Sequence, residues 1–160
     1  MTVTIRPATP QDCGTILRFI RELAEYEREP DAVEATEQTL AASLFGQSPA
    51  AEALIAERDG EAIGFALFFH NFSTWKGKRG LYLEDLYITP AARGSGAGKA
   101  LLVHLAGLAL DRDCARFEWA VLDWNAPAIA FYRAMGATGM DEWTVQRISG
   151  DALARLAGRG

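Results

Sequence analysis

The sequence predicts a single domain of the mixed α/β class, in which strands and helices are interleaved. Segments whose apolar residues suit strands alternate along the chain with segments whose apolar residues recur at helical spacing. The 160 residues fit one ordinary domain, so we expect it to span residues 1–160. The AVILMFWYC residues make up 49% of the chain and charged residues 23%, which is typical of a soluble protein with a substantial core.

The first part of the chain predicts one strand and two helices. Val3–Arg6 is a short strand that Pro7 ends. Asp12–Glu27 has apolar residues at helical spacing and is predicted to be a helix. Thr36 is a good N-cap for a second, shorter helix, which we expect to end before Gly46 in a left-handed turn.

A hairpin is predicted next. Ala53–Glu57 and Ala62–Phe69 suit strands, and the Asp-Gly dipeptide between them favours a tight turn because glycine tolerates positive φ. His70–Gly80 is polar and contains another glycine, so we expect a loop. Leu81–Ile88 is the next predicted strand.

The last part of the chain predicts a further alternation of helices and strands. Ala100–Leu110 is an apolar helix, and Arg116–Leu122 is rich in residues that favour strands. Asn125–Met135 is predicted to be a helix with Asn125 as its cap and Gly136 as its stop. Trp143–Ile148 is predicted to be the last strand, and Ala152–Ala157 a short helix.

Composition excludes several classes of function. Two cysteines, Cys13 and Cys114, cannot build a disulfide framework or a cysteine-based zinc site. Only two histidines are present, so we expect no metal centre. A net charge of −5 disfavours nucleic acid as a partner and suits a cationic small molecule.

The same composition bears on location. The longest apolar runs, such as Ala62–Phe69, are far shorter than the roughly 20 residues of a membrane span. Met1–Arg6 has no signal-peptide core. We therefore expect a cytoplasmic protein with no membrane partner.

A glycine-rich segment between a strand and a helix is typical of an anion-binding turn, although a glycine cluster alone also suits a merely flexible turn. A Walker A loop would need glycine at position 93 and Ser or Thr at 100, where the chain has Arg93 and Ala100. A dinucleotide fingerprint that starts at Gly94 would need glycine at position 99, where the chain has Lys99. The pattern that remains is Arg-x-x-Gly-x-Gly, formed by Arg93, Gly96 and Gly98.

This pattern resembles the Gln/Arg-x-x-Gly-x-Gly/Ala loop of the GNAT N-acetyltransferase superfamily. A second motif of the superfamily, Asn-x-x-Ala-x-x-Phe-Tyr-x-x-x-Gly, matches residues 125–136. The resemblance implies a GNAT domain with a splayed central mixed sheet flanked by helices, and acetyl-CoA as co-substrate. The cofactor-binding residues that it implies are Leu86, Tyr87 and Ile88 in the strand, Arg93, Gly94, Ser95, Gly96, Ala97, Gly98 and Lys99 in the loop, and Asn125, Ala128 and Tyr132 in the later helix.

Over nearly its whole length the chain is similar to the spermidine/spermine (diamine) acetyltransferase family. Residues 81–85 (Leu-Tyr-Leu-Glu-Asp) carry part of this likeness, and residues 73–77 and 120–125 look most like its thialysine acetyltransferase branch. The family's acidic loop after the cofactor-side helix is shortened here to Asp141-Glu142. The family precedent implies a homodimer. The shortened loop disfavours a long polyamine, and the likeness to the branch implies a small primary amine as substrate, a thialysine- or lysine-like compound or a diamine.

Candidate catalytic residues follow from what amine acetylation needs. Tyr132 is the candidate acid for the departing thiolate, against the alternative of a core tyrosine. Glu84 is the candidate base or water-relay anchor, against the alternative of a carboxylate on the solvent side of its strand. The resemblance implies further substrate contacts from Tyr26, Glu27, Glu118 and Trp119, besides Glu84.

Three alternatives stay open. The acceptor could be a polyamine such as spermidine or spermine, or an amine on a protein, because a fold does not fix a substrate. The chain could also be a non-catalytic acyl-CoA-binding module. A substrate with an α-carboxylate would need a cation, for which Lys76, Lys78 and Arg79 are candidates.

Overall fold

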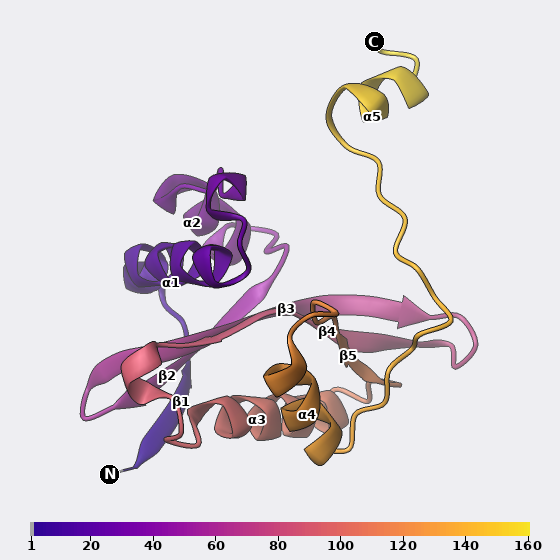
Figure 1. The fold of residues 1–160 in the computed structure, drawn as a ribbon. Helices are drawn as coiled ribbons and strands as arrows, with labels where there is room; N and C mark the ends of the chain where they lie inside the picture. Colours follow the sequence, from indigo (N-terminus) through magenta and orange to yellow (C-terminus); the bar gives the residue numbers. More distant parts are fainter. Residues whose placement is uncertain (1) are drawn as a thin grey trace. The chain divides into compact units, whose positions relative to one another are not determined.

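The computed structural model describes residues 2–160, which form two compact units, one up to Ala120 and one of Val121–Gly160. Figure 1 labels their elements. The first unit contains β1 (Val3–Pro7), α1 (Cys13–Tyr26), α2 (Glu37–Phe45), β2 (Glu52–Arg58), β3 (Glu61–Ser73), β4 (Lys78–Ile88), α3 (Ala97–Asp111), β5 (Phe117–Trp119) and three short 3₁₀ turns, Pro10–Asp12, Pro30–Ala32 and Pro90–Ala92. The second unit contains α4 (Ala126–Ala134) and α5 (Gly150–Leu156). None of the helices in residues 2–160 is long and apolar enough to cross a membrane.

The strands form one mixed sheet in the order β1-β2-β3-β4-β5. The first four strands are antiparallel, and β5 runs parallel to β4. The predicted hairpin is confirmed, because Asp59 and Gly60 both have positive φ, 55° and 78°, as a two-residue turn requires.

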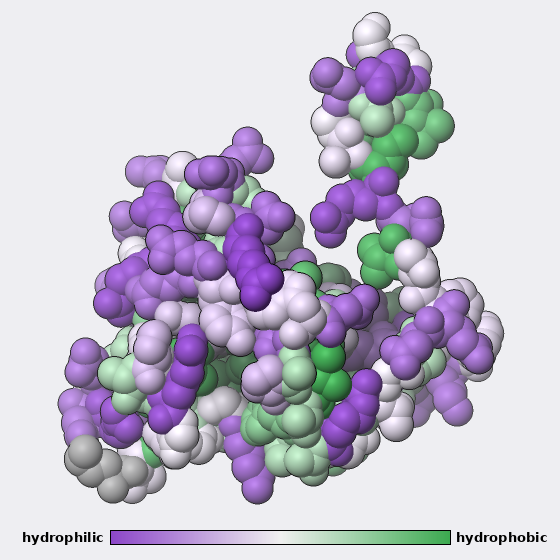
Figure 2. All heavy atoms as spheres, in the orientation of Figure 1, coloured by the Kyte–Doolittle hydropathy of each residue, from purple (hydrophilic) through white to green (hydrophobic). Residues whose placement is uncertain are grey.

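Helices cover both faces of this sheet, with α1 and α2 on one side and α3 on the other (Figure 1). On the α1 side Phe19 and Phe65 are fully buried, and their ring centroids are 5.9 Å apart. On the α3 side Leu101 and Leu105 are fully buried. Hydrophilic side chains dominate the outer surface over α1 and α2, whereas α5 carries apolar side chains on one side (Figure 2).

A partly buried ion pair links the start of α1 to β1. Arg6 Nη1 lies 2.8 Å from Asp12 Oδ2, and the Thr9 amide donates to the same oxygen at 2.7 Å. Arg6 Nε also lies 3.1 Å from Glu57 Oε1. These contacts, chiefly the hydrogen bond from Arg6, lower the pKa of Asp12 to about 2.

Most predicted elements are confirmed, but three predictions are wrong in part and a fourth is wrong altogether. The predicted loop His70–Gly80 is mostly strand, because β3 and β4 pair through to Ser73 and Lys78 and leave only a four-residue turn. The predicted strand Arg116–Leu122 is shortened to β5. Helix α2 does end before Gly46, but Gly46 is extended (φ −74°) rather than left-handed.

The fourth correction concerns Trp143–Ile148, which forms no strand in the described structure. An alternating pattern becomes a strand only when a neighbouring strand pairs with its backbone. Here Trp143 is 70% exposed and Val145 80% exposed, and no strand among the described residues pairs with this segment.

Candidate active site

The central feature of the first unit is a β-bulge in β4. Leu83 pairs with Phe68 and Asp85 pairs with Leu67, which leaves Glu84 as an extra residue in β4. The bulge also marks where the sheet opens, because β5 pairs with β4 only over Leu81–Leu83 among the described residues. From Glu84 onward β4 therefore presents unpaired backbone groups on its β5 side.

The bulge assembles three carboxylates, Glu27, Glu84 and Asp85, which we call the acidic triad. Glu84 is exposed and Asp85 is half-buried. Burial, followed by the negative charges of Glu84 and Glu27, raises the pKa of Asp85 to about 6. Burial and the charge of Glu84 also raise the pKa of Glu27. The triad is thus a concentrated negative charge that favours a cation.

Glu27 reaches this place because α1 ends immediately before it. The amide of Glu27 donates to Leu23 O at 2.9 Å, and the chain then turns at Arg28, whose φ is 65°. The amide of Glu29 closes the turn by donating to Ala24 O at 2.8 Å. This backbone geometry fixes Glu27 at the end of the helix, close to β4.

Two further predicted substrate residues, Glu118 and Trp119, lie on β5. Glu118 is near enough to Tyr82 for its charge to raise the tyrosine's pKa, after burial and Glu84. Its carboxylate is already engaged, with Arg116 Nε at 2.9 Å and Asn71 Nδ2 at 3.3 Å. Trp119 is half-buried, with its ring 4.9 Å from that of Phe117. A substrate amine would have to compete with Arg116 for Glu118.

The glycine-rich loop follows directly after β4. Gly94 and Gly96 have φ of 82° and 87°, which favours glycine, and a Cβ at either position would meet nothing within 4 Å. Gly96 is the N-cap of α3, so the amides of Gly98 and Lys99 have no acceptor within the helix. The Ala97 amide is oriented by Ser95 Oγ at 3.3 Å. Open space, free amides and a positive helix end together make an anion cradle.

Arg93 and Tyr26 connect this loop to α1. The guanidinium carbon of Arg93 lies 5.3 Å from the centroid of the Tyr26 ring. Arg93 Nε donates to Ile88 O at 3.3 Å, which holds the side chain against the end of β4. The Arg93 guanidinium therefore stacks on Tyr26, the residue directly before Glu27.

The remaining predicted residues lie in the second unit. Asn125 caps α4, and its Oδ1 accepts a hydrogen bond from the Ala128 amide at 3.4 Å. Tyr132 is half-buried on the same helix, with its ring 5.6 Å from that of Phe131. Helix α4 stops just before Gly136, as predicted, and Gly136 has a positive φ of 99°. The structure thus gathers Tyr26, Glu27 and Glu84 with the loop in one unit and carries Tyr132 on the other.

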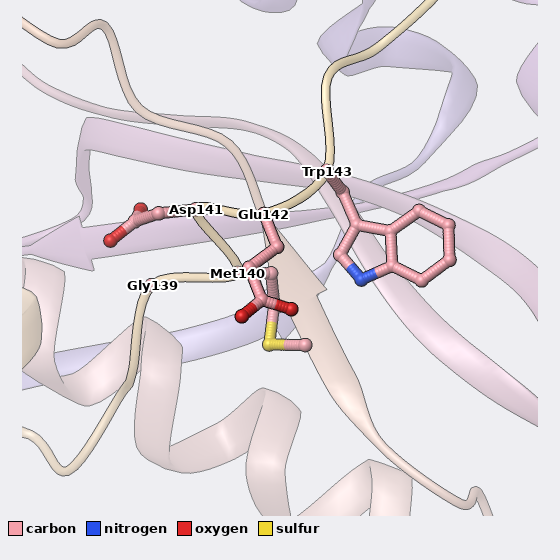
Figure 3. Close-up of a pocket in the computed structure, with 5 residues that line it drawn as sticks. All are labelled: Gly139, Met140, Asp141, Glu142 and Trp143. Carbon is pink, nitrogen blue, oxygen red and sulfur yellow. The ribbon is translucent and has the colours of Figure 1, made fainter.

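A pocket in the second unit is a weaker candidate. It is lined by a single short segment, Gly139–Trp143, with the Asp141 carboxylate pointing away from Glu142 and Trp143 (Figure 3). Met140 is 60% exposed, and no predicted site residue lines the pocket. A wall made of five consecutive residues offers no convergent polar groups from different elements, so we assign this pocket no catalytic role.

Sequence reasoning missed two features of this site. Asp85 is part of the acidic triad, and two adjacent carboxylates in an apolar strand were the signal that could have identified it. The hydroxyl of Tyr87 donates to Glu22 Oε1 at 2.7 Å, a contact between residues far apart in the sequence that no local pattern indicates.

Comparisons with known proteins identify the family of the chain. The sequence profile of the acetyltransferase (GNAT) family matches residues 16–137. The chain is 44% identical to a thialysine N-epsilon-acetyltransferase from Bos taurus, over 98% of both chains. It is 31% identical to an L-ornithine N5-acetyltransferase from Arabidopsis thaliana, over 93% of this chain and 85% of that one. Among solved structures, an integron cassette protein from the mobile metagenome of V. cholerae is 30% identical, with a TM-score of 0.81 and 98% of both chains covered.

Proposed function

The chain belongs to the GNAT acetyltransferase family, and we propose that it transfers an acetyl group from acetyl-CoA to the side-chain amine of thialysine or a closely related lysine-like compound. The observation that carries this proposal is that one strand, β4, holds the acidic triad at its bulge and leads directly into the anion cradle at its end. A cationic acceptor and an anionic donor would therefore meet along one strand.

The cradle fits the pyrophosphate of acetyl-CoA. The amides of Gly94 to Lys99 would hold its oxygens, and the open space over Gly94 and Gly96 allows close approach to the backbone. The unpaired edge of β4 at Leu86–Ile88 offers backbone donors and acceptors to the amide groups of the pantetheine arm. Asn125 and Ala128 are assigned to the same cofactor on their motif alone.

The acidic triad would hold the substrate ammonium by charge-assisted hydrogen bonds. A lysine-like amine has a pKa of about 10.4 and must lose a proton before it can attack a carbonyl. Glu84 is exposed at the bulge and would accept that proton, directly or through water. Acetyl-CoA supplies the acetyl group: the amine nitrogen bonds to the thioester carbonyl carbon, the C–S bond breaks, and the products are an acetamide and the thiol of CoA.

Tyr132 would donate the proton that the departing sulfur needs. This assignment rests on the residue type and on the motif that it shares with Asn125.

The choice of amine rests on the relatives together with the basic side chain of Lys76 in the β3–β4 turn. Of the three basic residues considered for an α-carboxylate, Lys78 pairs with Asp113 at 2.9 Å and Arg79 donates to Arg112 O at 3.3 Å. Within the described residues the Lys76 ammonium makes no such contact, so we assign the α-carboxylate to Lys76.

The test is kcat/KM for thialysine, lysine, putrescine and spermidine under one set of conditions, measured by release of the CoA thiol. We expect thialysine to have the highest kcat/KM. In Lys76→Ala the ratio of kcat/KM for thialysine to kcat/KM for putrescine should fall, because putrescine has no carboxylate. A spermidine value about tenfold above that of thialysine would overturn the choice of amine. Binding of acetyl-CoA without thiol release for any amine would indicate an acyl-CoA-binding module instead.

Two further assignments belong to this proposal. We assign the protein to the cytoplasm on its composition, and to a homodimer on the family precedent. Sedimentation of the purified chain would test the dimer, since a monomer has a mass of 17.4 kDa.

A further inference from the structure

The cofactor loop and the end of α1 share one side chain, that of Arg93. Its guanidinium carbon lies 5.3 Å from the centre of the Tyr26 ring, while its Nε donates to Ile88 O at 3.3 Å. Within residues 2–160 the structure shows no hydrogen bond or ion pair from the terminal nitrogens of Arg93. The flat face of this cation is therefore occupied and its outer donors are available.

A second contact holds the same side of α1 one turn earlier. Arg18, Glu22 and Tyr26 are spaced four residues apart and so share one face of the helix. Glu22 Oε1 accepts a hydrogen bond from the hydroxyl of the buried Tyr87 at 2.7 Å. This hydrogen bond anchors α1 to β4 without a hydrogen bond from Arg93. A variant of Glu22 therefore tests the docking of α1 as a whole, whereas variants of Arg93 and Tyr26 test the placement of Tyr26.

We propose that Arg93 is a positioning residue that couples the binding of acetyl-CoA to the binding of the amine, an inference that rests on the proposed function. An arginine can stack through its face while its in-plane N–H groups bind phosphate. A pyrophosphate in the loop would engage those groups and hold the guanidinium against Tyr26.

The consequence for the amine follows from chain connectivity. Tyr26 is the last residue of α1 and Glu27, a member of the acidic triad, is its C-cap, so holding Tyr26 against the loop steadies the backbone of the last turn, from which the Glu27 side chain extends. An amine that binds second then loses less conformational freedom on ordering its site. The coupling is reciprocal, so the amine strengthens the binding of CoA by the same factor.

Titration calorimetry tests this coupling. CoA replaces acetyl-CoA so that no turnover occurs, and thialysine is the amine probe. The quantity measured is the ratio of the thialysine Kd without CoA to the Kd with saturating CoA. We expect a ratio of at least about fivefold for the parent protein, the lower end of typical coupling.

Three variants separate positioning from structure. In Arg93→Gln, which keeps a residue found at this position of the family motif, and in Tyr26→Leu, the ratio should fall to about one. Tyr26→Phe keeps the ring face and should restore the ratio to within about twofold of the parent. In steady state, Arg93→Gln should raise the KM for the amine at saturating acetyl-CoA more than it lowers kcat.

Glu22→Gln is the matched control, because its amide oxygen can still accept from Tyr87 and it lies on the same face of α1. Its ratio should equal that of the parent. Binding of CoA to the parent with a ratio of one, or an unchanged ratio in both Arg93→Gln and Tyr26→Leu, would overturn the coupling alone. Failure of the parent to bind CoA would overturn the proposed function together with it.

Discussion

Replacement of Asp85 by asparagine should stabilise the protein at neutral and alkaline pH. Folding raises the pKa of this carboxyl from 3.8 to about 6 because the group is buried beside Glu84 and Glu27. Since the folded state holds the proton more tightly, stability is lost as pH rises from about 4 to 6. The difference in pKa corresponds to about 3 kcal/mol of unfolding free energy above pH 6.

The assay is urea unfolding of the parent and of Asp85→Asn at about pH 8 and about pH 4. At the higher pH the variant should be more stable by up to about 3 kcal/mol, and at the lower pH the two should converge. Glu84→Gln removes one of the charges that oppose ionisation of Asp85, so in that background the gain from Asp85→Asn should shrink.

Asp12→Asn is a control of opposite sign. The bond from Arg6 lowers the pKa of Asp12 from 3.8 to about 2, so this carboxylate stabilises the fold above pH 4 and the contribution is lost as pH falls toward 2. If Asp85→Asn is as destabilising as Asp12→Asn at pH 8, the reasoning about the acidic triad is refuted.

Two other changes test the loop and Tyr132, and the control Asp12→Asn is itself a test of the ion pair. Gly96→Val should weaken acetyl-CoA binding in calorimetry by about 10-fold or more, because the side chain fills the space over the loop. Ser95→Ala, as the control, should change the affinity little. Equal affinity for Gly96→Val and the parent would remove the loop assignment. Tyr132→Phe should lower kcat by about 10²–10⁴ with acetyl-CoA binding little changed, and a parental kcat with chemistry as the slow step would leave Tyr132 a packing residue. Asp12→Asn should cost about 2 kcal/mol of unfolding free energy near pH 7, measured by urea unfolding; an unchanged free energy would show that the ion pair contributes nothing net.

Elements with strong local signals could be predicted from the sequence. Thr36 caps α2 by accepting from the Thr39 amide at 3.1 Å, and Asn125 caps α4 in the same way. The Asp59-Gly60 turn and the glycines of the loop need positive φ, which few other residues adopt readily. In each case a few neighbouring residues decide the structure.

Features set by distant partners could not be predicted. The polar segment after Phe69 becomes strand because β4 pairs with it residue by residue as far as Lys78. Trp143–Ile148 begins with the alternating pattern of a strand, at Trp143 and Val145, but has no pairing in the described structure. The contact of Arg93 with Tyr26 joins residues that are far apart in the chain, and no periodicity brings them together.

The bulge at Glu84 explains why two adjacent carboxylates are tolerated in an apolar strand. In a regular strand Glu84 and Asp85 would point to opposite faces, and one of them would enter the core. The extra residue leaves Glu84 exposed and Asp85 only half-buried. The same irregularity lies where β5 stops pairing, so the backbone beyond it is unpaired on that side. One inserted residue thus creates both the negative site for an amine and the open strand edge for a cofactor. The raised pKa of Asp85 shows that burying this carboxylate beside Glu84 and Glu27 costs folding free energy when the group is ionised.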